Sequence, residues 1–378
     1  MRNVVVAGYA RSPFHLAGKG ALARVRPDDL AAQVIRGLIQ QTGVKAEDIE
    51  DIVLGCAFPE GEQGFNIARL IGLLADLPLS VGGMTVNRFC GSSMSSVHIA
   101  AGQIQLGAGE AFICAGVESM SRVPMMGFNP LPNLELAKKS AAYMGMGDTA
   151  ENIATKYQIT RAQQEAFAVA SQDKAAAAIA AGKLEAEIVP ITTKAGVVDK
   201  DGTPRAGTTT ETLAGLKPAF SQDGTVTAGT SSPLTDGASA ILVTSEDYAR
   251  AHGLPILARI KSVAVSGCQP EIMGIGPVEA SRKALQRAGL SVDQLDVVEL
   301  NEAFASQSLA CISDLGLDQS KVNLDGGAIA IGHPLGATGA RIVGKAAALL
   351  KREGGSYALA TQCIGGGQGI ATVLEAAE

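Results

Sequence analysis

The chain has 378 residues, more than one hydrophobic core usually serves, so we expect two or three substructures. Apolar residues make up 47% and charged residues 18%, a composition typical of a folded globular protein. The formal net charge of −6 offers no overall basic surface for nucleic acid, and no apolar run approaches the ~20 residues that cross a bilayer. We therefore expect no nucleic-acid partner and no membrane span.

The first residues, MRNVVVAGYARSPF, predict a β-strand rather than a secretion signal, because they lack an apolar core followed by a cleavage site. The six cysteines form no C-x-x-C pair, and only four histidines are present, so their spacing argues against a zinc site. Most of the cysteines are expected to be buried free thiols, as in a reducing compartment. We predict a cytoplasmic location and no bound metal.

The chain contains an internal repeat, because four segments of the first half have counterparts in the same order in the second. In the first pair, a helix ends at a glycine, an acidic turn follows, and an apolar strand comes next. Each copy alternates strand and helix, which is typical of an α/β fold. The paired segments are residues 40–57 and 286–303, 85–87 and 321–323, 110–120 and 356–366, and 236–243 and 368–375.

The first copy is interrupted between its last two strands by residues 121–234, which we interpret as an inserted lid over the core. This insertion contains Pro-rich loops, a long helical stretch that starts near DTAENIATK, and a Gly/Thr-rich tail. Asp148 and Thr149 are expected to cap the start of that helix. The predicted domains are an N-terminal half (1–120 and 235–257), the insertion (121–234) and a C-terminal half (258–378).

Cys90 lies in VNRFCGSSM, after a strand-like stretch and at the start of a predicted helix. A helix N-terminus offers unpaired N–H groups and a positive dipole end, which lower the pKa of a thiol. The small residues Gly91, Ser92 and Ser93 leave room for a substrate. The alternative is an inert core cysteine packed at a strand–helix junction.

His333 is the candidate base for such a thiol, because it lies in the Gly-rich turn AIGHPLGATGAR before a predicted helix. The alternative is a surface-loop imidazole without a role. Cys363 precedes a run of glycines in TQCIGGGQG, whose N–H groups can stabilise an oxyanion. A phosphate-binding loop is the competing interpretation, and it fails because neither stretch carries the G-x-x-x-x-G-K-[ST] pattern.

Four segments, NRFCGSSM, NEAFA, GGAIAIGHPLGATGAR and QCIGGGQG, occur in this order over nearly the whole chain, and together they resemble the thiolase family. The resemblance implies a thiolase-like α/β fold in which two duplicated halves are stacked in five layers (αβαβα). It also implies a loop domain inserted in the first half, which covers coenzyme A. This layout agrees with the repeat and its interruption.

The resemblance implies a site with two reactive cysteines. Cys90 is similar to the nucleophile that becomes acylated, and His333 to the imidazole that keeps it ionised. Cys363 resembles the second cysteine, which moves a proton to and from the α-carbon of acetyl-CoA. Asn301 resembles the residue that holds a water and forms one oxyanion hole with His333. The backbone N–H groups of Cys90 and Gly365 resemble the second hole.

The resemblance further implies coenzyme A as a co-substrate and no permanently bound cofactor. Ser232 is similar to a pantetheine contact, and Lys217 occupies the place of a basic residue near the nucleotide, the alternative being a solvated surface charge. Met273 and Phe304 resemble walls of the acyl pocket, the alternative being plain core residues. The expected ligands are 3-ketoacyl-CoA, acetyl-CoA and CoA, and the expected assembly is a homodimer or a homotetramer.

The predicted function is CoA-dependent cleavage of a 3-ketoacyl-CoA through a cysteine acyl-enzyme, as in fatty-acid β-oxidation. The alternatives are an acetoacetyl-CoA thiolase, a decarboxylating ketoacyl synthase and a non-catalytic acyl-CoA or lipid carrier. The synthase needs a second catalytic histidine in place of Cys363, and a carrier would have lost one of the reactive residues. Gly145, where short-chain relatives carry histidine, favours substrates of medium or greater length.

Overall fold

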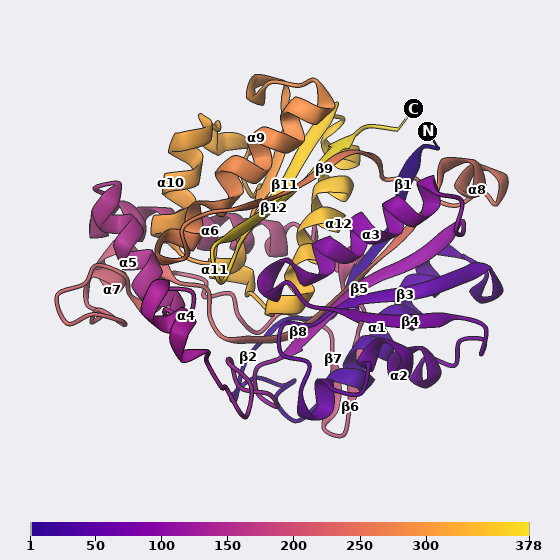
Figure 1. Ribbon diagram of the computed structural model, residues 1–378, viewed down its shortest axis with the longest axis horizontal. Helices are drawn as coiled ribbons and strands as arrows, with labels where there is room; N and C mark the ends of the chain where they lie inside the picture. Colours follow the sequence, from indigo (N-terminus) through magenta and orange to yellow (C-terminus); the bar gives the residue numbers. More distant parts are fainter. Residues whose placement is uncertain (1, 378) are drawn as a thin grey trace.

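The computed structural model describes residues 2–377, and its first half is built on a mixed sheet (Figure 1). Its strands are, in spatial order, β1 (Val4–Arg11), β8 (Thr235–Ser245), β5 (Ala111–Ser119), β3 (Ile49–Gly55) and β4 (Gly82–Val86), and β2 (His15–Leu16) pairs with β8. β3 is parallel to both β4 and β5, whereas β8 is antiparallel to β5 and β1. β1, β5 and β8 are buried along their whole lengths, because helices cover both faces of the sheet.

The second half repeats this arrangement with its own strands. They are, in spatial order, β10 (Val297–Leu300), β11 (Tyr357–Ile364), β12 (Gln368–Glu375) and β9 (Ala258–Gly267). β10 is parallel to β11, and β12 is antiparallel to β11 and β9, which matches β3, β5, β8 and β1 in both order and direction. A short pairing of β1 with β9 joins the two halves into one ten-stranded sheet.

The predicted repeat of helix, glycine and strand is confirmed. Helices α1 (Pro27–Thr42) and α9 (Gly276–Ala288) end at Gly43 and Gly289, whose φ angles are 72° and 69°. This left-handed conformation is strained for a residue with a side chain, so glycine allows each helix to end and the chain to turn toward its next strand. The same local solution occurs once in each half.

Helices and sheets stack in five layers, which confirms the predicted fold class (Figure 1). α3 (Ser92–Gln105) and α12 (Leu335–Glu353) lie between the two halves of the sheet, where their apolar side chains share one cluster with residues of both. α1 and α2 (Ile67–Leu74) cover the outer face of the first half, and α9 and α10 (Ala305–Leu315) cover that of the second. Each interface is filled by its own apolar cluster.

The chain between β5 and β8, which we call the insertion, contains further helices and two short strands. Its predicted long helix is in fact two helices, separated by a turn in which Gln158 has φ 54°. The insertion contains α4 (Leu134–Lys139), α5 (Met146–Lys156), α6 (Arg161–Ala180), β6 (Ile191–Thr193), β7 (Gly196–Val198) and α7 (Thr210–Ala214). The remaining helices are α8 (Glu246–Ala251) and α11 (Ala328–Ile331).

The expected helix cap in the insertion is wrong. α5 begins directly after Gly145, so Asp148 and Thr149 lie inside its first turn and do not precede it. A side-chain cap exists instead at the start of α6, where Thr160 and Gln163 form a capping box. The hydrogen bonds of this box stabilise a second helix start and explain why the predicted helix is divided.

Candidate active site

Cys90 lies in a tight turn between β4 and α3. The preceding residue, Phe89, has φ 45°, which is a strained conformation for an aromatic residue. Two hydrogen bonds hold the turn: the N–H of Phe89 donates to Asn87 Oδ1 at 2.8 Å, and the N–H of Arg88 donates to Ser92 Oγ at 2.9 Å. The turn places Cys90 at the start of a helix, as predicted, with 9% of its surface exposed.

Burial affects the ionisation of Cys90 more strongly than the helix start does. Desolvation raises the pKa of the thiol to about 11, although the backbone N–H groups of Gly365 and of Cys90 itself favour the thiolate. The expectation of a lowered pKa, drawn from the sequence, is therefore wrong. The same two N–H groups point toward the sulfur, so they are placed to stabilise negative charge that develops beside it.

His333 lies in the turn between α11 and α12 and is 4% exposed. Burial, together with the charge of Arg341, lowers the pKa of the imidazole to about 3, so it is neutral at physiological pH. Its Nδ1 lies 2.6 Å from Thr338 Oγ1, and that hydroxyl donates to Pro334 O at 3.3 Å. Because the hydroxyl hydrogen is already used, we assign the proton to Nδ1, which leaves Nε2 as a proton acceptor.

Asn301 follows β10 and brings an amide to the same imidazole. Its Nδ2 lies 3.4 Å from His333 Nε2, and its backbone N–H donates to Thr361 O at 3.0 Å. Its Oδ1 is buried and accepts no hydrogen bond from the part of the chain that the structure describes. A buried amide oxygen without a partner is costly, so this position is suited to a polar ligand.

Cys363 lies near the end of β11, where the strand leads into the Gly-rich loop. Burial raises the pKa of its thiol well above the usual value, and the charge of a Cys90 thiolate acts in the same direction, which indicates that the two sulfurs are close. A Cβ atom at Gly365 would lie 3.4 Å from the Met146 sulfur and 3.8 Å from the Phe89 ring. The Cys90 turn, the Gly-rich loop and the insertion therefore meet at one place.

Two residues expected to line the acyl pocket lie in one apolar cluster with Cys363. Met273 and Phe304 are 2% and 7% exposed, and Met146 packs at the edge of this cluster. Both are positioned beside the second thiol rather than in one of the cores between layers. This placement fits the expected wall of an acyl pocket, and it also limits the free space around Cys363.

Of the two predicted coenzyme A contacts, one lies beside the Cys363 cluster and the other lies on an exposed loop. Ser232 is next to the Cys363 cluster, because its N–H donates to Ala303 O at 2.9 Å. Lys217 is exposed on the loop that follows α7 and belongs to no cluster. Farther along the same loop, Phe220 packs edge-on against Phe304, with 5.9 Å between ring centroids. The loop of Lys217 therefore reaches the site through Phe220, whereas the side chain of Lys217 is exposed to solvent.

Two buried side chains that connect the parts of the site were missed from the sequence. Gln362, in β11, donates from Nε2 to the carbonyl oxygen of Cys90. Glu118, in β5, accepts a hydrogen bond from the N–H of Gly336 in α12 at 2.9 Å. A charged residue within the apolar stretch FICAGVESM was the available signal for Glu118, whereas no local pattern marks Gln362.

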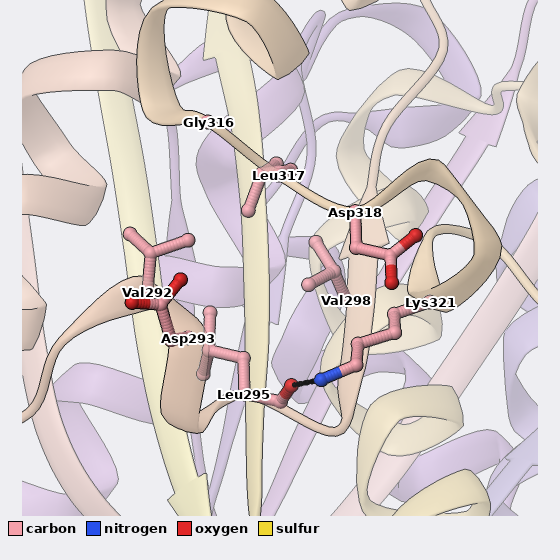
Figure 2. Close-up of a pocket in the computed structure, with 8 residues that line it drawn as sticks. All are labelled: Val292, Asp293, Leu295, Val298, Gly316, Leu317, Asp318 and Lys321. Carbon is pink, nitrogen blue, oxygen red and sulfur yellow. Dashed lines mark hydrogen bonds between the residues drawn. The ribbon is translucent and has the colours of Figure 1, made fainter.

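A small surface pocket of 160 Å³ lies apart from this site, beside the start of β10 (Figure 2). In this pocket Lys321 donates a hydrogen bond to Leu295 O at 2.6 Å. The pocket is separate from the candidate site, because Asn301 follows the other end of β10. Among residues 2–377, we find no group of three or more His, Cys, Asp and Glu side chains that could hold a metal ion. In the same residues, no helix combines the length and the apolar character that crossing a membrane requires.

A buried thiol can form a thioester when an imidazole nitrogen accepts its proton, and the His333 turn packs against the Cys90 cluster through Leu335. N–H groups directed at the sulfur can stabilise the charge of that step. The class of protein that this fold and site indicate is an acyltransferase. Comparison with family models is specific: residues 4–247 match the thiolase N-terminal domain, and residues 254–376 match the thiolase C-terminal domain. The chain belongs to the thiolase family.

Curated relatives match over their full lengths. The chain is 47% identical to the 3-ketoacyl-CoA thiolase of Bacillus subtilis and 49% identical to that of Vibrio cholerae, covering 99% of this chain and 100% of each relative. Among solved structures, human mitochondrial 3-ketoacyl-CoA thiolase in complex with CoA superposes with a TM-score of 0.92 at 38% identity, covering 100% of this chain and 98% of that chain.

Proposed function

We propose that the protein cleaves 3-ketoacyl-CoA with coenzyme A, producing acetyl-CoA and an acyl-CoA shortened by one acetyl unit, as a step of fatty-acid β-oxidation. The main support for the proposal is that the Cys90 turn and the Cys363 loop meet. The His333 turn joins them, because Leu335 packs in one cluster with Cys90. The names of the curated relatives and the CoA-bound human structure support the substrate class.

In the first half-reaction, Cys90 attacks the ketone carbon while His333 Nε2 accepts the thiol proton. The bond between that carbon and the α-carbon breaks, which leaves the acyl group on Cys90 as a thioester and releases an acetyl-CoA enolate. Cys363 donates its proton to the α-carbon and becomes a thiolate. The N–H groups of Cys90 and Gly365 stabilise charge on the acyl oxygen, and Asn301 with His333 stabilises charge on the enolate oxygen.

In the second half-reaction, the thiol of coenzyme A attacks the acyl group on Cys90. Its proton passes to the Cys363 thiolate, and the imidazolium of His333 returns its proton to Cys90. Each residue thereby regains its starting protonation state. Two thiols are required because one must carry the acyl group while the other exchanges a proton with carbon.

The favoured substrates have acyl chains of medium or greater length. Residues 125–136 of the insertion expose apolar side chains, with Phe128 at 59% and Leu131 at 82%. Gly145 is exposed directly before Met146, which enters the site, so no side chain covers the pocket at that point. Each additional CH₂ that is buried contributes about 0.8 kcal/mol, which corresponds to about fourfold in kcat/KM.

A Gly145→His substitution tests this assignment. A Cβ at Gly145 would approach only the flexible Asp148 carboxylate, at 2.8 Å, so the fold should tolerate the change. We expect wild-type kcat/KM to rise from acetoacetyl-CoA toward 3-ketopalmitoyl-CoA, and the variant to shift the profile toward acetoacetyl-CoA. A wild-type optimum at acetoacetyl-CoA would show that the insertion does not receive longer chains.

The second candidate function is an acetoacetyl-CoA thiolase. The burial of Met273 and Phe304 beside Cys363 favours it, because these side chains narrow the space for an acyl group. The same chain-length series distinguishes the two functions. The underlying reaction is tested by following the loss of 3-ketoacyl-CoA absorbance with and without free CoA, and no CoA-dependent loss at any chain length would refute it.

The proposal includes a homodimer, with a homotetramer as the larger alternative. β4 is the edge strand of the first half, and Asn66 binds it through Gly83 O at 2.8 Å. The neighbouring Phe65 is 93% exposed and has φ 56°, a strained conformation for an aromatic residue. A second copy that pairs along β4 would cover both the strand edge and this ring.

The expected cytoplasmic location also belongs to this proposal. Its support is the cysteine chemistry: all six cysteines are free, and five of them are buried. Unpaired thiols are typical of proteins that work in a reducing compartment. The proposed ligands are 3-ketoacyl-CoA, acetyl-CoA and CoA, with CoA serving as a co-substrate.

A further inference from the structure

Glu118 lies near the end of β5 and is 1% exposed, yet it is surrounded by hydrogen-bond donors. Its Oε2 accepts from the N–H groups of Ala57 at 2.8 Å and Gly336 at 2.9 Å. Its Oε1 accepts from Gln63 Nε2 at 2.8 Å and from the N–H of Phe58 at 3.2 Å. One carboxylate therefore collects donors from three separate segments of the chain.

These donors require the ionised form of Glu118. A protonated carboxyl group has to place its own hydrogen on an acceptor, and both of its oxygens already face N–H groups. Burial raises the pKa of Glu118 above its usual value, and the surrounding N–H groups offset part of that rise by favouring the carboxylate. The arrangement resembles an anion held by several N–H donors, which is a strong type of hydrogen bonding in a buried site.

Glu118 connects the two halves of the active site. Ala57 packs in one cluster with Cys90 and Leu335, and Leu335 directly precedes Gly336. Ala57 belongs to the first half and Gly336 to the second, and the N–H groups of both donate to the same oxygen, Glu118 Oε2. A Cβ at Gly336 would lie 2.8 Å from the Cys56 Cα, so the two backbones approach too closely for a side chain.

We propose that Glu118 is a positioning residue for the thiolase reaction: it holds the segment after His333 against the wall of the Cys90 site. The inference rests on the proposed roles of Cys90 and His333. It extends them, because it assigns the alignment of base and nucleophile to a residue that touches neither substrate nor reacting atoms.

The charge of Glu118 provides a readout that a purely structural role would not affect. Burial is the main cause of the raised pKa of Cys90, and the negative charge of Glu118 acts in the same direction. Cys363, in β11, also interacts electrostatically with Cys90. It is a neutral thiol at rest because burial raises its pKa, so it adds no negative charge beside Cys90. The Arg88 guanidinium is directed to Ser95 and to Gln368. Removal of the Glu118 charge should therefore make the Cys90 thiol easier to ionise.

The test uses two substitutions at Glu118 and a matched control elsewhere. Glu118→Gln removes the charge and leaves N–H donors facing an NH₂ group. Glu118→Asp keeps the charge but shortens the side chain by one methylene group. Glu187→Gln is the control, because Glu187 is a buried carboxylate that pairs with Arg11 and Lys345 and not with the active site. For each protein we would measure kcat and KM per acylatable site, the unfolding temperature, and the pH dependence of Cys90 alkylation by iodoacetamide.

We expect Glu118→Gln to lower kcat ~10²-fold with KM little changed, because a misaligned base slows the reaction more than it weakens binding. The midpoint of Cys90 alkylation should move to lower pH, because a negative charge that disfavours the thiolate is removed. Glu118→Asp should lower kcat but keep the wild-type midpoint. The control should change the unfolding temperature alone.

Gln63→Met provides a milder variant in case both substitutions at Glu118 prevent folding. It removes one donor from Oε1 and leaves both backbone bonds to Oε2, so kcat should fall less and the alkylation midpoint should not move to lower pH. The inference is overturned if the Glu118 variants lower stability while kcat and the midpoint stay at wild-type values, or if only one of the two responds. Failure of wild-type Cys90 to become acylated would instead reject the proposed function.

Discussion

At the scale of single residues, burial keeps both partners of the proposed proton transfer uncharged. It raises the pKa of Cys90 to about 11 and lowers that of His333 to about 3. Each shift disfavours an isolated charge, whereas a thiolate and an imidazolium formed in the same step stabilise each other. In the proposed mechanism, the attack of Cys90 on the substrate is therefore coupled to the arrival of its proton on His333.

Cys363→Ser tests the separation of roles between the two thiols. A serine hydroxyl is a much weaker acid than a thiol, so the exchange of a proton with the α-carbon should slow by ~10²–10⁴-fold. Formation of the acyl-enzyme on Cys90 from a simple acyl-CoA should remain close to wild type. The two half-reactions can be measured separately, by solvent-deuterium exchange into acetyl-CoA and by acylation, and equal losses in both would show that Cys363 has a structural role.

At the scale of elements, the two halves end corresponding helices in the same way. Gly43→Ala should destabilise the protein by about 1–2 kcal/mol, because alanine is strained in the left-handed conformation that φ 72° requires. An added Cβ meets no other atom within 4 Å, so the strain is not combined with a steric clash. The matched control is Gly102→Ala inside α3, where the added Cβ also has open space. It should stabilise by roughly 0.5–1 kcal/mol. Urea unfolding measures both, and a stabilised Gly43→Ala variant would contradict the strain argument.

Strands and helix ends such as Gly43 were predictable, because their signals are local and recur in the second half. The break before α6 was missed because the capping box of Thr160 and Gln163 lies within an otherwise helical sequence. Contacts of Glu118 and Gln362 could not be predicted, since their partners come from distant segments. The pKa of Cys90 depends on burial, which the local sequence does not reveal.

For the whole molecule, the layered arrangement brings the starts of α3 and α12 together, and with them the Cys90 and His333 turns (Figure 1). The backbones approach closely there: a Cβ at Gly339 would lie 2.2 Å from the Met94 nitrogen. Each half contributes one turn, so neither half alone contains the site. The duplication therefore produces a candidate active site whose two turns are related by the repeat but carry different side chains.

Phe65→Asp tests the proposed dimer. A carboxylate on a surface that a second copy buries would be desolvated without a partner, so the variant should be monomeric or weakly associated in light-scattering measurements. Leu131→Asp is the control, because Leu131 is also a highly exposed apolar residue but lies in the insertion. A wild-type protein that is monomeric at micromolar concentration, or an unaffected Phe65→Asp variant, would reject pairing along β4.

The central claim is that Cys90 carries the acyl group, and the most direct measurement is to locate that group. The protein would be incubated with an acyl-labelled 3-ketoacyl-CoA without free CoA, quenched in acid, digested, and mapped by mass spectrometry. The account predicts one acyl group on the peptide that contains Cys90, its release on addition of CoA, and no label in a Cys90→Ala variant that remains folded. Label on Cys363 or on any other residue, or full turnover by Cys90→Ala, would contradict it.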